Sequence, residues 1–197
     1  MHLIKSKHNR EIEEMRATSG VSPVEGQYLA WLAQVYVRTT AVEIGSCEGR
    51  SACYILDALA DLRREAVLHC VDLWELGQGS TPPKHSTPKA YARFKKNLTT
   101  LELWEHAVPH KGLSSDIAAE WGSQIDMLFI DGSHQYEYVR QDYEMWSPFV
   151  RIGGVLAFHD ANQEDVGRVL LELPIERWAR LPLSGGRIAA YTRRGTP

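Results

Sequence analysis

Acidic and histidine side chains follow short apolar runs at four places in the chain. In chain order they are Glu43, Asp72, Asp131 and the pair His159–Asp160. Such groups can bind a cation, accept hydrogen bonds from hydroxyl groups or remove a proton from a nucleophile. One acid at the end of an apolar run could arise by chance, whereas four indicate a ligand site.

The apolar runs that carry these residues are predicted to be strands of one sheet. Predicted strands cover residues 40–45, 66–72, 107–110, 125–132 and 153–160, and helices are expected from about residues 51, 115 and 135 and after residue 160. This alternation favours an α/β domain with a mainly parallel sheet and helices on both faces. Two last β-rich runs, 175–181 and 187–192, flank Ser184-Gly185-Gly186 and predict a terminal antiparallel hairpin. Because ligands of open α/β sheets bind beyond the carboxyl ends of the strands, the acidic tips are expected to share one site.

A helix is predicted to begin after Ser22. The sequence Ser22-Pro23-Val24-Glu25 is a capping box with proline at the first helical position. A buried stripe is expected at helical spacing, formed by Val24, Tyr28, Trp31, Leu32 and Val35.

The glycine-bearing turn VEIGSCEGRS (residues 42–51) restricts the kind of ligand. A phosphate-binding P-loop needs four residues between its glycines and then Lys-Ser/Thr. Here three residues separate Gly45 from Gly49, and Glu48 would repel a phosphate. The dinucleotide pattern also fails, since Cys47 occupies the place of its second glycine. What remains suits a nucleoside without a pyrophosphate, with a cationic group near Glu43 and a ribose whose hydroxyls Asp72 accepts.

Composition limits the class of protein. The chain has 197 residues, 44% of them hydrophobic, and a net charge of −3, which predicts one globular domain and no nucleic-acid partner. No apolar run approaches the length of a membrane span, and the charged N-terminal residues do not fit a secretory signal. The three cysteines form no paired motif, which favours reduced thiols and a cytoplasmic protein.

Three segments fall outside this core pattern. Residues 1–21 are expected to form a helical extension. The polar segment 77–89, rich in glycine, proline, serine and threonine, is either a mobile lid or binding loop or a tolerated surface insertion. Arg93, Lys95 and Lys96 are expected on a solvated helix face.

An ordered set of motifs resembles the class I S-adenosylmethionine-dependent methyltransferases. It comprises Glu-x-Gly-x-x-x-Gly at residues 43–49, Asp72 after the second strand, and Ile-Gly-Gly at 152–154 before the fifth. The segments VDLWE (71–75), IDGSHQYEYVRQD (130–142) and GGVLAFHD (153–160) resemble the branch of macrocin-type sugar O-methyltransferases and cephalosporin hydroxylase-like proteins. The resemblance covers residues 22–192 and implies a Rossmann-like sheet of seven strands in a single domain over residues 1–197.

Carried onto this chain residue by residue, the resemblance implies cofactor contacts at several strand ends. Glu43 and the backbone of residues 45–49 would lie against the methionine part of S-adenosylmethionine, Asp72 would accept the ribose hydroxyls, and Ser115 would border the adenine. The implied cofactor-binding residues are Glu43, Gly45, Ser46, Cys47, Gly49, Ser51, Asp72, Leu73, Trp74, Ser115 and Asp131. Trp74 either shapes the adenine or acceptor pocket or packs in the core.

Methyl transfer to oxygen needs an acceptor hydroxyl that is aligned and deprotonated. The sugar- and catechol-methylating relatives bind Mg²⁺ through acids at these strand ends, which implies a divalent cation at Asp131 and Asp160, with His159 as a third ligand. The sugar methyltransferases tend to have an acid where this chain has His159. Imidazole suits zinc, iron or manganese better than Mg²⁺, so the identity and the presence of a metal stay open.

His134 matches the histidine proposed as general base in the sugar-methylating relatives, and with Asp131 it is the implied catalytic residue. His134 lies near the start of a predicted helix. The positive end of the helix dipole disfavours the imidazolium and keeps the imidazole of His134 neutral. The alternative is a histidine in the cap region with no chemical role.

The sequence therefore predicts a cytoplasmic enzyme that methylates an oxygen of a small hydroxylated molecule with S-adenosylmethionine and a divalent cation. Homo-oligomers remain possible. A metal-independent N- or C-methyltransferase, or a nucleoside-binding module without catalysis, remains an alternative. A nicotinamide-dependent reductase is disfavoured by Cys47 and Glu48 in the glycine turn.

Overall fold

The structure is a computed structural model that describes residues 7–15, 20–61, 65–74, 89–182 and 185–195. The predicted loop 77–89 falls outside these residues except at its last position. Of the predicted N-terminal extension, residues 7–15 and 20–21 are described, and they include one short helix, α1 (Asn9–Glu14).

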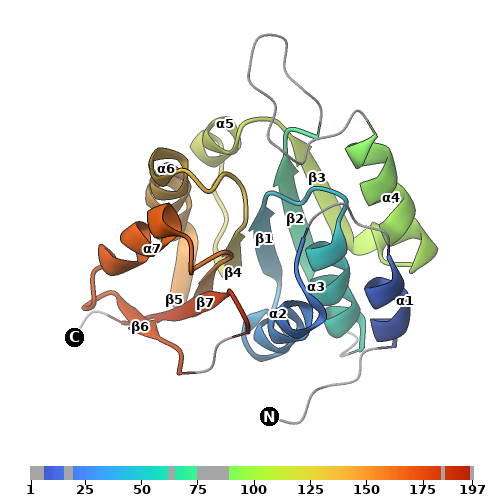
Figure 1. Ribbon diagram of the computed structural model, residues 1–197, viewed down its shortest axis with the longest axis horizontal. Coiled ribbons are helices and arrows are strands. Elements are labelled where there is room, and N and C mark those ends of the chain that lie inside the picture. The colour runs from blue at the N-terminus through green and yellow to red at the C-terminus, as the bar shows by residue number, and fades with distance from the viewer. Residues whose placement is uncertain (1–6, 16–19, 62–64, 75–88, 183–184, 196–197) are drawn as a thin grey trace.

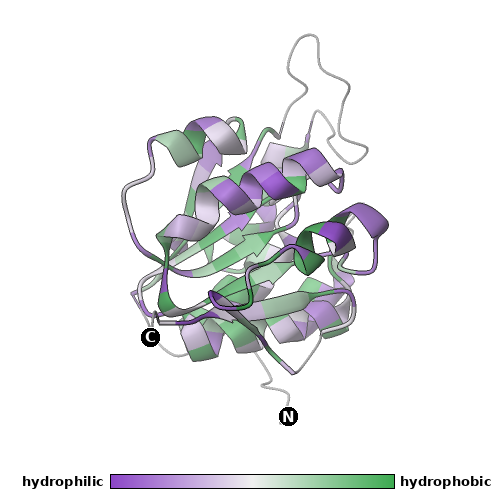
Figure 2. Ribbon diagram, turned by 90° about the vertical axis from the view of Figure 1, so that its left-hand side faces the viewer, coloured by the Kyte–Doolittle hydropathy of each residue, from purple (hydrophilic) through white to green (hydrophobic). Residues whose placement is uncertain are grey.

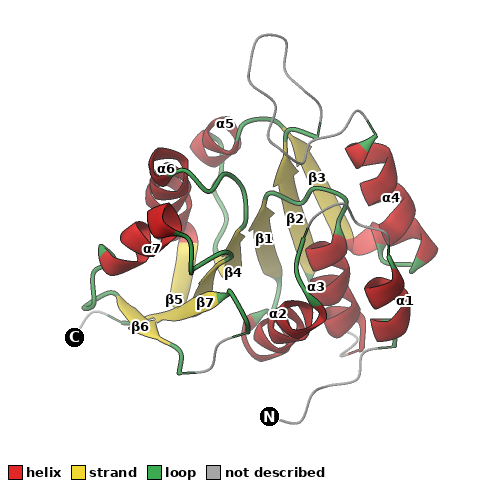
Figure 3. Cartoon of the chain, in the orientation of Figure 1, coloured by secondary structure: helices red, strands yellow, loops and turns green. Residues whose placement is uncertain are grey.

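Seven strands of the described chain form one sheet in the order β3-β2-β1-β4-β5-β7-β6 (Figures 1 and 3). β3, β2, β1, β4 and β5 are parallel, whereas β7 pairs antiparallel with both β5 and β6. The strands are β1 (Thr40–Ile44), β2 (Val67–Asp72), β3 (Ala107–Lys111), β4 (Ile125–Ile130), β5 (Val150–Phe158), β6 (Trp178–Arg180) and β7 (Ala189–Arg193). The predicted Rossmann-like sheet with its terminal hairpin is therefore confirmed.

Helices cover both faces of this sheet (Figure 1). One face carries α2 (Pro23–Tyr36), α3 (Arg50–Asp61) and α4 (Ala90–Thr100), and the other carries α5 (Ser114–Ala119), α6 (Tyr136–Trp146) and α7 (Glu164–Leu171). Short 3₁₀ turns, η1 (Trp104–His106) and η2 (Ser147–Phe149), precede β3 and β5. Most of the helices turn polar faces outward, while the strands inside are apolar (Figure 2).

The strands alternate between two apolar cores because successive side chains of a strand point to opposite faces. In β4, Met127 and Phe129 join the core under α2, α3 and α4, while Leu128 and Ile130 join the core under α5, α6 and α7. All six residues of β4 are buried, as expected for the central strand of a parallel sheet. The sheet is thus a rigid support for whatever follows its carboxyl edge.

The N-terminus of α2 has the predicted capping box. The amide of Ser22 donates to a carboxylate oxygen of Glu25 (2.7 Å), and the amide of Glu25 donates to the Ser22 hydroxyl (3.4 Å). Two of the backbone donors at this helix end are therefore satisfied within four residues of chain.

The predicted buried stripe of α2 is wrong at both ends. Val24 and Val35 are 63% and 40% exposed, whereas Tyr28 and Leu32 are buried. The helix turns Gly26 toward α3 instead, where a Cβ atom would lie 2.1 Å from the ring of Tyr54. Close contact between the two helices through a glycine thus decides which face is buried, and hydrophobic spacing alone does not report it.

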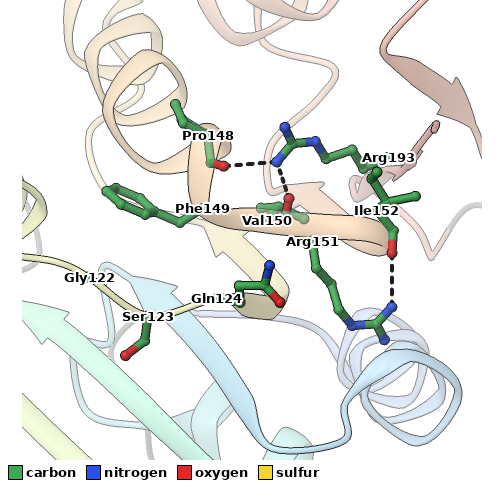
Figure 4. A pocket seen from close by; sticks show the side chains of 9 residues that line it. All are labelled: Gly122, Ser123, Gln124, Pro148, Phe149, Val150, Arg151, Ile152 and Arg193. Carbon is green, nitrogen blue, oxygen red and sulfur yellow. Dashed lines mark hydrogen bonds between the residues drawn. The ribbon is translucent and has the colours of Figure 1, made fainter. Parts of the chain in front are cut away.

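A hollow of about 300 Å³ lies at the amino edge of the parallel strands, away from all the predicted site residues (Figure 4). It is lined by residues 122–124, 148–152 and Arg193. The guanidinium groups of Arg151 and Arg193 there donate to backbone carbonyl oxygens, so they are engaged in holding the strand ends. In the described part of the chain no helix is long and apolar enough to cross a membrane.

Candidate active site

The carboxyl edge of the sheet brings the predicted acidic tips together. The amide of Asp131 donates to the carbonyl oxygen of Ile44 (2.8 Å), and the amide of His159 donates to that of Ile130 (3.0 Å). These bonds continue the ladder one residue beyond the strands. The tips of β1, β4 and β5 therefore lie side by side in a fixed register.

The glycine turn after β1 approaches the β4 tip closely. Gly45 has a φ of 91°, and a Cβ atom at this position would lie 2.2 Å from the backbone oxygen of Asp131. Only glycine fits such a conformation and such a contact. Cys47, two residues later, also has a positive φ (45°), so the turn is strained at a residue that is not glycine.

Asp72 holds this turn in place. Its carboxylate accepts hydrogen bonds from the amides of Cys47 (2.7 Å) and Trp74 (2.6 Å). Burial raises the pKa of Asp72, and these backbone hydrogen bonds offset the rise only in part. A carboxylate has about four acceptor positions, so Asp72 can still accept hydroxyl groups of a ligand while it supports the turn.

Trp74 lies in the core and contacts the turn from beneath. Its ring is fully buried against Tyr91 and Phe94. Its indole nitrogen donates to the backbone oxygen of Cys47 (2.7 Å). Of the two interpretations of Trp74, the geometry supports core packing, with an effect on the site that passes through the turn.

Glu43 is a buried carboxylate without a counter-charge. It has no exposed surface, and neither of its oxygens has a hydrogen-bond partner of good geometry. Burial raises its pKa to about 7, the charges of Asp131 and Asp72 add to the rise, and the nearby hydroxyls of Ser51 and Ser46 reduce it. A group of this kind is suited to a cationic ligand that supplies the missing charge.

Glu48 is buried and paired with a cation, so its charge is compensated. Its side chain is 2% exposed and pairs with the guanidinium of Arg93 on α4 (2.6 Å), while Asn97 donates to its backbone oxygen (2.8 Å). Arg93 is exposed, as predicted for this helix face, and it has the additional role of pairing with Glu48. Its charge compensates an acid that the turn buries, and burial of an acid is tolerated when it is paired.

The loop after β3 is fixed to α6. The indole nitrogen of Trp146 donates to the hydroxyl of Ser114 (2.7 Å), and Ser114 in turn bonds the buried carboxylate of Asp142, whose pKa burial raises to about 6. Ser115, the predicted adenine neighbour, is half-buried beside Asp116. Leu73, at the end of β2, is also half-buried.

Four side chains form a cluster after β4 and β5. Each of Asp131, His134, His159 and Asp160 offers one ligand atom, and these atoms lie within 4.8 Å of one another. The imidazole Nδ1 of His159 is 2.8 Å from Asp131 Oδ1, and the imidazole Nε2 of His134 is 3.1 Å from Asp160 Oδ2. The three residues predicted as metal ligands and the predicted base are therefore in direct contact.

The carboxylates of the cluster favour the protonated form of the His159 ring. Burial lowers the pKa of His159, but the hydrogen bond to Asp131 and the charges of Asp160 and Glu25 outweigh burial, and the pKa is raised overall. His159 Nε2 has no hydrogen-bond partner and lies 3.4 Å from Glu25 Oε2. The cluster thus concentrates negative charge around its two rings.

His134 lies just before the helix rather than in its first turn, since α6 begins at Tyr136 and Gln135 is the N-cap. Its side chain is 34% exposed, which leaves it accessible to an acceptor molecule. Its second ring nitrogen, Nδ1, is 3.3 Å from the amide nitrogen of Gln163. Both nitrogens are therefore oriented by neighbouring side chains.

Two residues of the site were missed in the sequence. Glu25 and Arg187 contact His159 and Asp160 from behind. Glu25 has a clear sequence signal, but that signal is for helix capping. Arg187 has none, because only the paired hairpin brings it to the end of β5.

Comparison with known proteins identifies the family. A family model described as a methyltransferase domain matches residues 42–161, which is more than half of the chain. The chain therefore belongs to this methyltransferase family. The match spans the glycine turn and all four members of the His/Asp cluster.

Solved structures show the same fold at low sequence identity. An O-methyltransferase from Bacillus cereus in complex with S-adenosylhomocysteine has a TM-score of 0.71 and 16% identity over 98% of this chain and 94% of that chain. The O-methyltransferase TomG from Streptomyces achromogenes, involved in tomaymycin synthesis and in complex with S-adenosylmethionine, has a TM-score of 0.70 and 14% identity over 99% and 93%. An rRNA methylase from Streptococcus thermophilus has a TM-score of 0.61 and 13% identity over 85% and 95%.

Family and fold together define the chain as a class I S-adenosylmethionine-dependent methyltransferase, as the sequence resemblance predicts. The structural relatives act on different kinds of acceptor, so the fold alone does not identify the substrate. That question depends on the site.

Proposed function

We propose that this enzyme transfers the methyl group of S-adenosylmethionine to an oxygen of a small hydroxylated molecule. The observation that carries this proposal is the contact of Asp131, His134, His159 and Asp160 in one cluster whose first member touches the glycine turn. A base and acidic groups beside the cofactor turn are what an alcohol acceptor needs, because the alcohol must lose its proton as it attacks. The net charge of −3 supports a small acceptor, met in the cytoplasm, over a nucleic acid.

The cofactor is proposed to lie along the carboxyl edge of β1 and β2. Glu43 would compensate the ammonium group of the methionine part, and Asp72 would accept the ribose hydroxyls. Both groups are buried or half-buried, and the glycine turn between them exposes no phosphate-binding lysine. This charge pattern suits S-adenosylmethionine, which is cationic and has no phosphate.

His134 is proposed to accept the proton of the acceptor hydroxyl. The carboxylate of Asp160, 3.1 Å from its Nε2, would stabilise the imidazolium that forms and hold the ring in one tautomer. In that tautomer Nε2 carries the proton and Nδ1 is the basic nitrogen. Gln163 beside Nδ1 would have to yield to the acceptor.

The cluster also fits a divalent cation. Two carboxylates and two imidazoles within 4.8 Å are donors typical of zinc, manganese or iron sites more than of magnesium sites. Asp131, Asp160 and His159 would hold the ion, and His134 could join them. When bound, the ion would lower the pKa of the acceptor hydroxyl and orient its oxygen.

A metal-independent variant of the same reaction is the second candidate. The observation that favours this candidate is the contact between Arg187 and Asp160. The guanidinium already supplies a positive charge to the carboxylate that would otherwise bind the metal ion. The two candidates differ in one measurable property. Chelation of divalent ions abolishes transfer in the first and leaves it unchanged in the second.

The proposal is tested with methyl-labelled S-adenosylmethionine and a panel of catechols, phenolic acids and sugars, with and without EDTA. We expect transfer to oxygen by the wild type and a loss of at least about 100-fold in His134→Gln, with S-adenosylhomocysteine still bound. Asp165→Asn, an exposed acid in the first turn of α7, is the control. Tight binding of S-adenosylhomocysteine with no transfer to any acceptor would contradict the proposal and favour a module without catalysis.

Metal binding is tested separately by isothermal titration of Mn²⁺, Zn²⁺ and Mg²⁺ into protein saturated with S-adenosylhomocysteine. The double variant Asp131→Ala/Asp160→Ala should lose the binding seen in the wild type. Unchanged binding in the double variant would exclude this cluster as the metal site.

A further inference from the structure

We propose that Arg187 is a positioning residue of this reaction: it holds one carboxylate oxygen of Asp160, so that only the other faces His134 and His159. The inference rests on the proposed function in that Asp160 has a chemical role there. Arg187 lies in the terminal hairpin, between β6 and β7.

The two oxygens of Asp160 have different partners. Oδ1 accepts a hydrogen bond from Nη1 of Arg187. Oδ2 is 3.1 Å from His134 Nε2 and 3.5 Å from His159 Nδ1. Because its two oxygens have different partners, the carboxylate of Asp160 cannot rotate freely. Only Oδ2 is then available to the two histidines.

Arg187 is itself anchored by Glu25. Its Nε donates to Glu25 Oε1 (2.9 Å) and its Nη2 to Glu25 Oε2 (3.2 Å), which is the bidentate arrangement that fixes a guanidinium most firmly. The Glu25 side chain is only 2% exposed, and it is held at the start of α2 by the amide of Ser22 (2.7 Å). These hydrogen bonds lower the pKa of Glu25 to about 2, although burial opposes them.

The backbone of the hairpin is fixed at the same place. The amide of Arg187 donates to Glu25 Oε1 (3.0 Å), and the amide of Ala161 donates to the backbone oxygen of Arg187 (2.8 Å). Gly186, with a φ of 66°, allows this approach, because a Cβ atom there would lie 3.0 Å from the Glu25 side chain. The hairpin therefore contacts Asp160 and the residue after it at once.

Asp160 needs such support because its backbone is strained. Its φ is 49°, in the left-handed region that an aspartate adopts only at a cost in free energy. Strain of this kind persists only where neighbouring groups determine the conformation. The Ser22–Glu25–Arg187–Asp160 chain of hydrogen bonds fixes the conformation of Asp160 from the N-terminus of α2.

The test compares Arg187→Met, Arg187→Lys and Arg187→Ala with Arg180→Met, which removes an exposed arginine of β6. The first readout is the ring-nitrogen spectrum of protein labelled with ¹⁵N-histidine, with signals assigned through His134→Gln. The second is the affinity for S-adenosylhomocysteine. The third is turnover on the best acceptor of the panel, with and without millimolar guanidinium.

We expect Arg187→Met to shift the His134 and His159 ring signals and to lower turnover by about 100-fold, since misplacement by about 1 Å costs that much. Affinity for S-adenosylhomocysteine should change by less than about threefold. Arg187→Lys should keep part of the turnover, and guanidinium should restore part of it to Arg187→Ala. Arg180→Met should match the wild type in every readout.

The proposal is overturned if the histidine spectrum of Arg187→Met superimposes on that of the wild type, or if its turnover is unchanged. An equal loss of cofactor affinity and turnover would also overturn it, because it would show a structural role alone. The spectrum needs no acceptor. If the wild type binds S-adenosylhomocysteine but shows no turnover, the proposed function is contradicted. The histidine spectrum still tests whether Arg187 positions Asp160.

Discussion

The indole nitrogen of Trp74 donates a 2.7 Å hydrogen bond to the backbone oxygen of Cys47 and so joins the end of β2 to the turn after β1. The amide of Cys47 is held at the same time by Asp72. Both polar groups of a residue with positive φ are thus satisfied by the neighbouring strand end. The turn that we propose as the cofactor site is therefore preformed.

Replacing Trp74 by Phe should weaken binding of S-adenosylhomocysteine by about 5- to 10-fold, because one buried hydrogen bond of about 1 kcal/mol is lost from the turn. Isothermal titration measures this effect. Trp121→Phe is the matched control, since Trp121 donates an equal bond (2.7 Å) to the backbone oxygen of Ser123, away from the site. Equal affinities of both variants would show that the turn does not need this bond.

Gly45→Ala should abolish measurable binding of S-adenosylhomocysteine. The added Cβ atom would lie 2.2 Å from the Asp131 backbone oxygen, and neither backbone can move without breaking the ladder at the strand ends. Gly122→Ala, whose Cβ atom would meet nothing within 4 Å, should bind as the wild type does. Normal binding by Gly45→Ala would mean that the turn differs from the one described.

Glu43→Gln should stabilise the apoprotein above pH 7 and weaken its cofactor binding. The pKa of Glu43 is about 7 when folded, above the usual value of 4.5. Between these values the folded state keeps a proton that the unfolded state has lost, so stability falls as pH rises through this window. The gain from Glu43→Gln should thus be on the order of 1–3 kcal/mol at pH 8 and vanish below pH 4.

Denaturant unfolding at pH 4, 6 and 8 measures this gain, with the exposed Glu120→Gln as control. A gain that does not depend on pH would contradict the assignment of a buried, uncompensated carboxylate. Stronger binding of S-adenosylmethionine by Glu43→Gln would contradict the role proposed for its charge.

The His69–His110 pair should make the protein sensitive to acid. Nδ1 of His69 lies 2.8 Å from Nε2 of His110 on the next strand, and burial, together with the charge of His110, lowers the pKa of His69 to about 4. Between pH 6.5 and 4 the unfolded state binds a proton that the folded state does not, so stability falls as pH falls through this window.

His69→Gln should therefore lose less stability than the wild type between pH 7 and 4.5, whatever its stability at pH 7. The melting temperature over this range measures the slope. His106→Gln, in the turn before β3, should keep the wild-type slope. If the melting temperatures of His69→Gln and the wild type fall equally with pH, the His69–His110 pair is not the acid-sensitive element.

The sequence predicts the sheet well because strand signals are local. Residues 127–130 form a continuous apolar run followed by Asp-Gly, and such a run in an α/β chain is typical of an internal strand. The same locality places Glu43, Asp72, Asp131 and Asp160 at strand ends, since a strand end is where the apolar run stops. The common edge then follows from the parallel sheet.

The rest depends on contacts between segments that are distant in the chain. Arg93 pairs with Glu48 and Arg187 with Glu25, at separations of 45 and 162 residues, and no spacing pattern reports either pair. The buried face of α2 was mispredicted for the same reason, because Gly26 is decisive only once Tyr54 faces it. Sequence patterns give the edges of elements, while packing decides which polar groups meet.

The most direct measurement is a crystal structure of the protein with S-adenosylhomocysteine. The account predicts the ligand's amino group beside Glu43, its ribose hydroxyls within hydrogen-bond distance of Asp72, and its sulfur facing Asp131 and His134. A homocysteine part that points away from Asp131 and His134 would contradict the claim that this cluster does the chemistry.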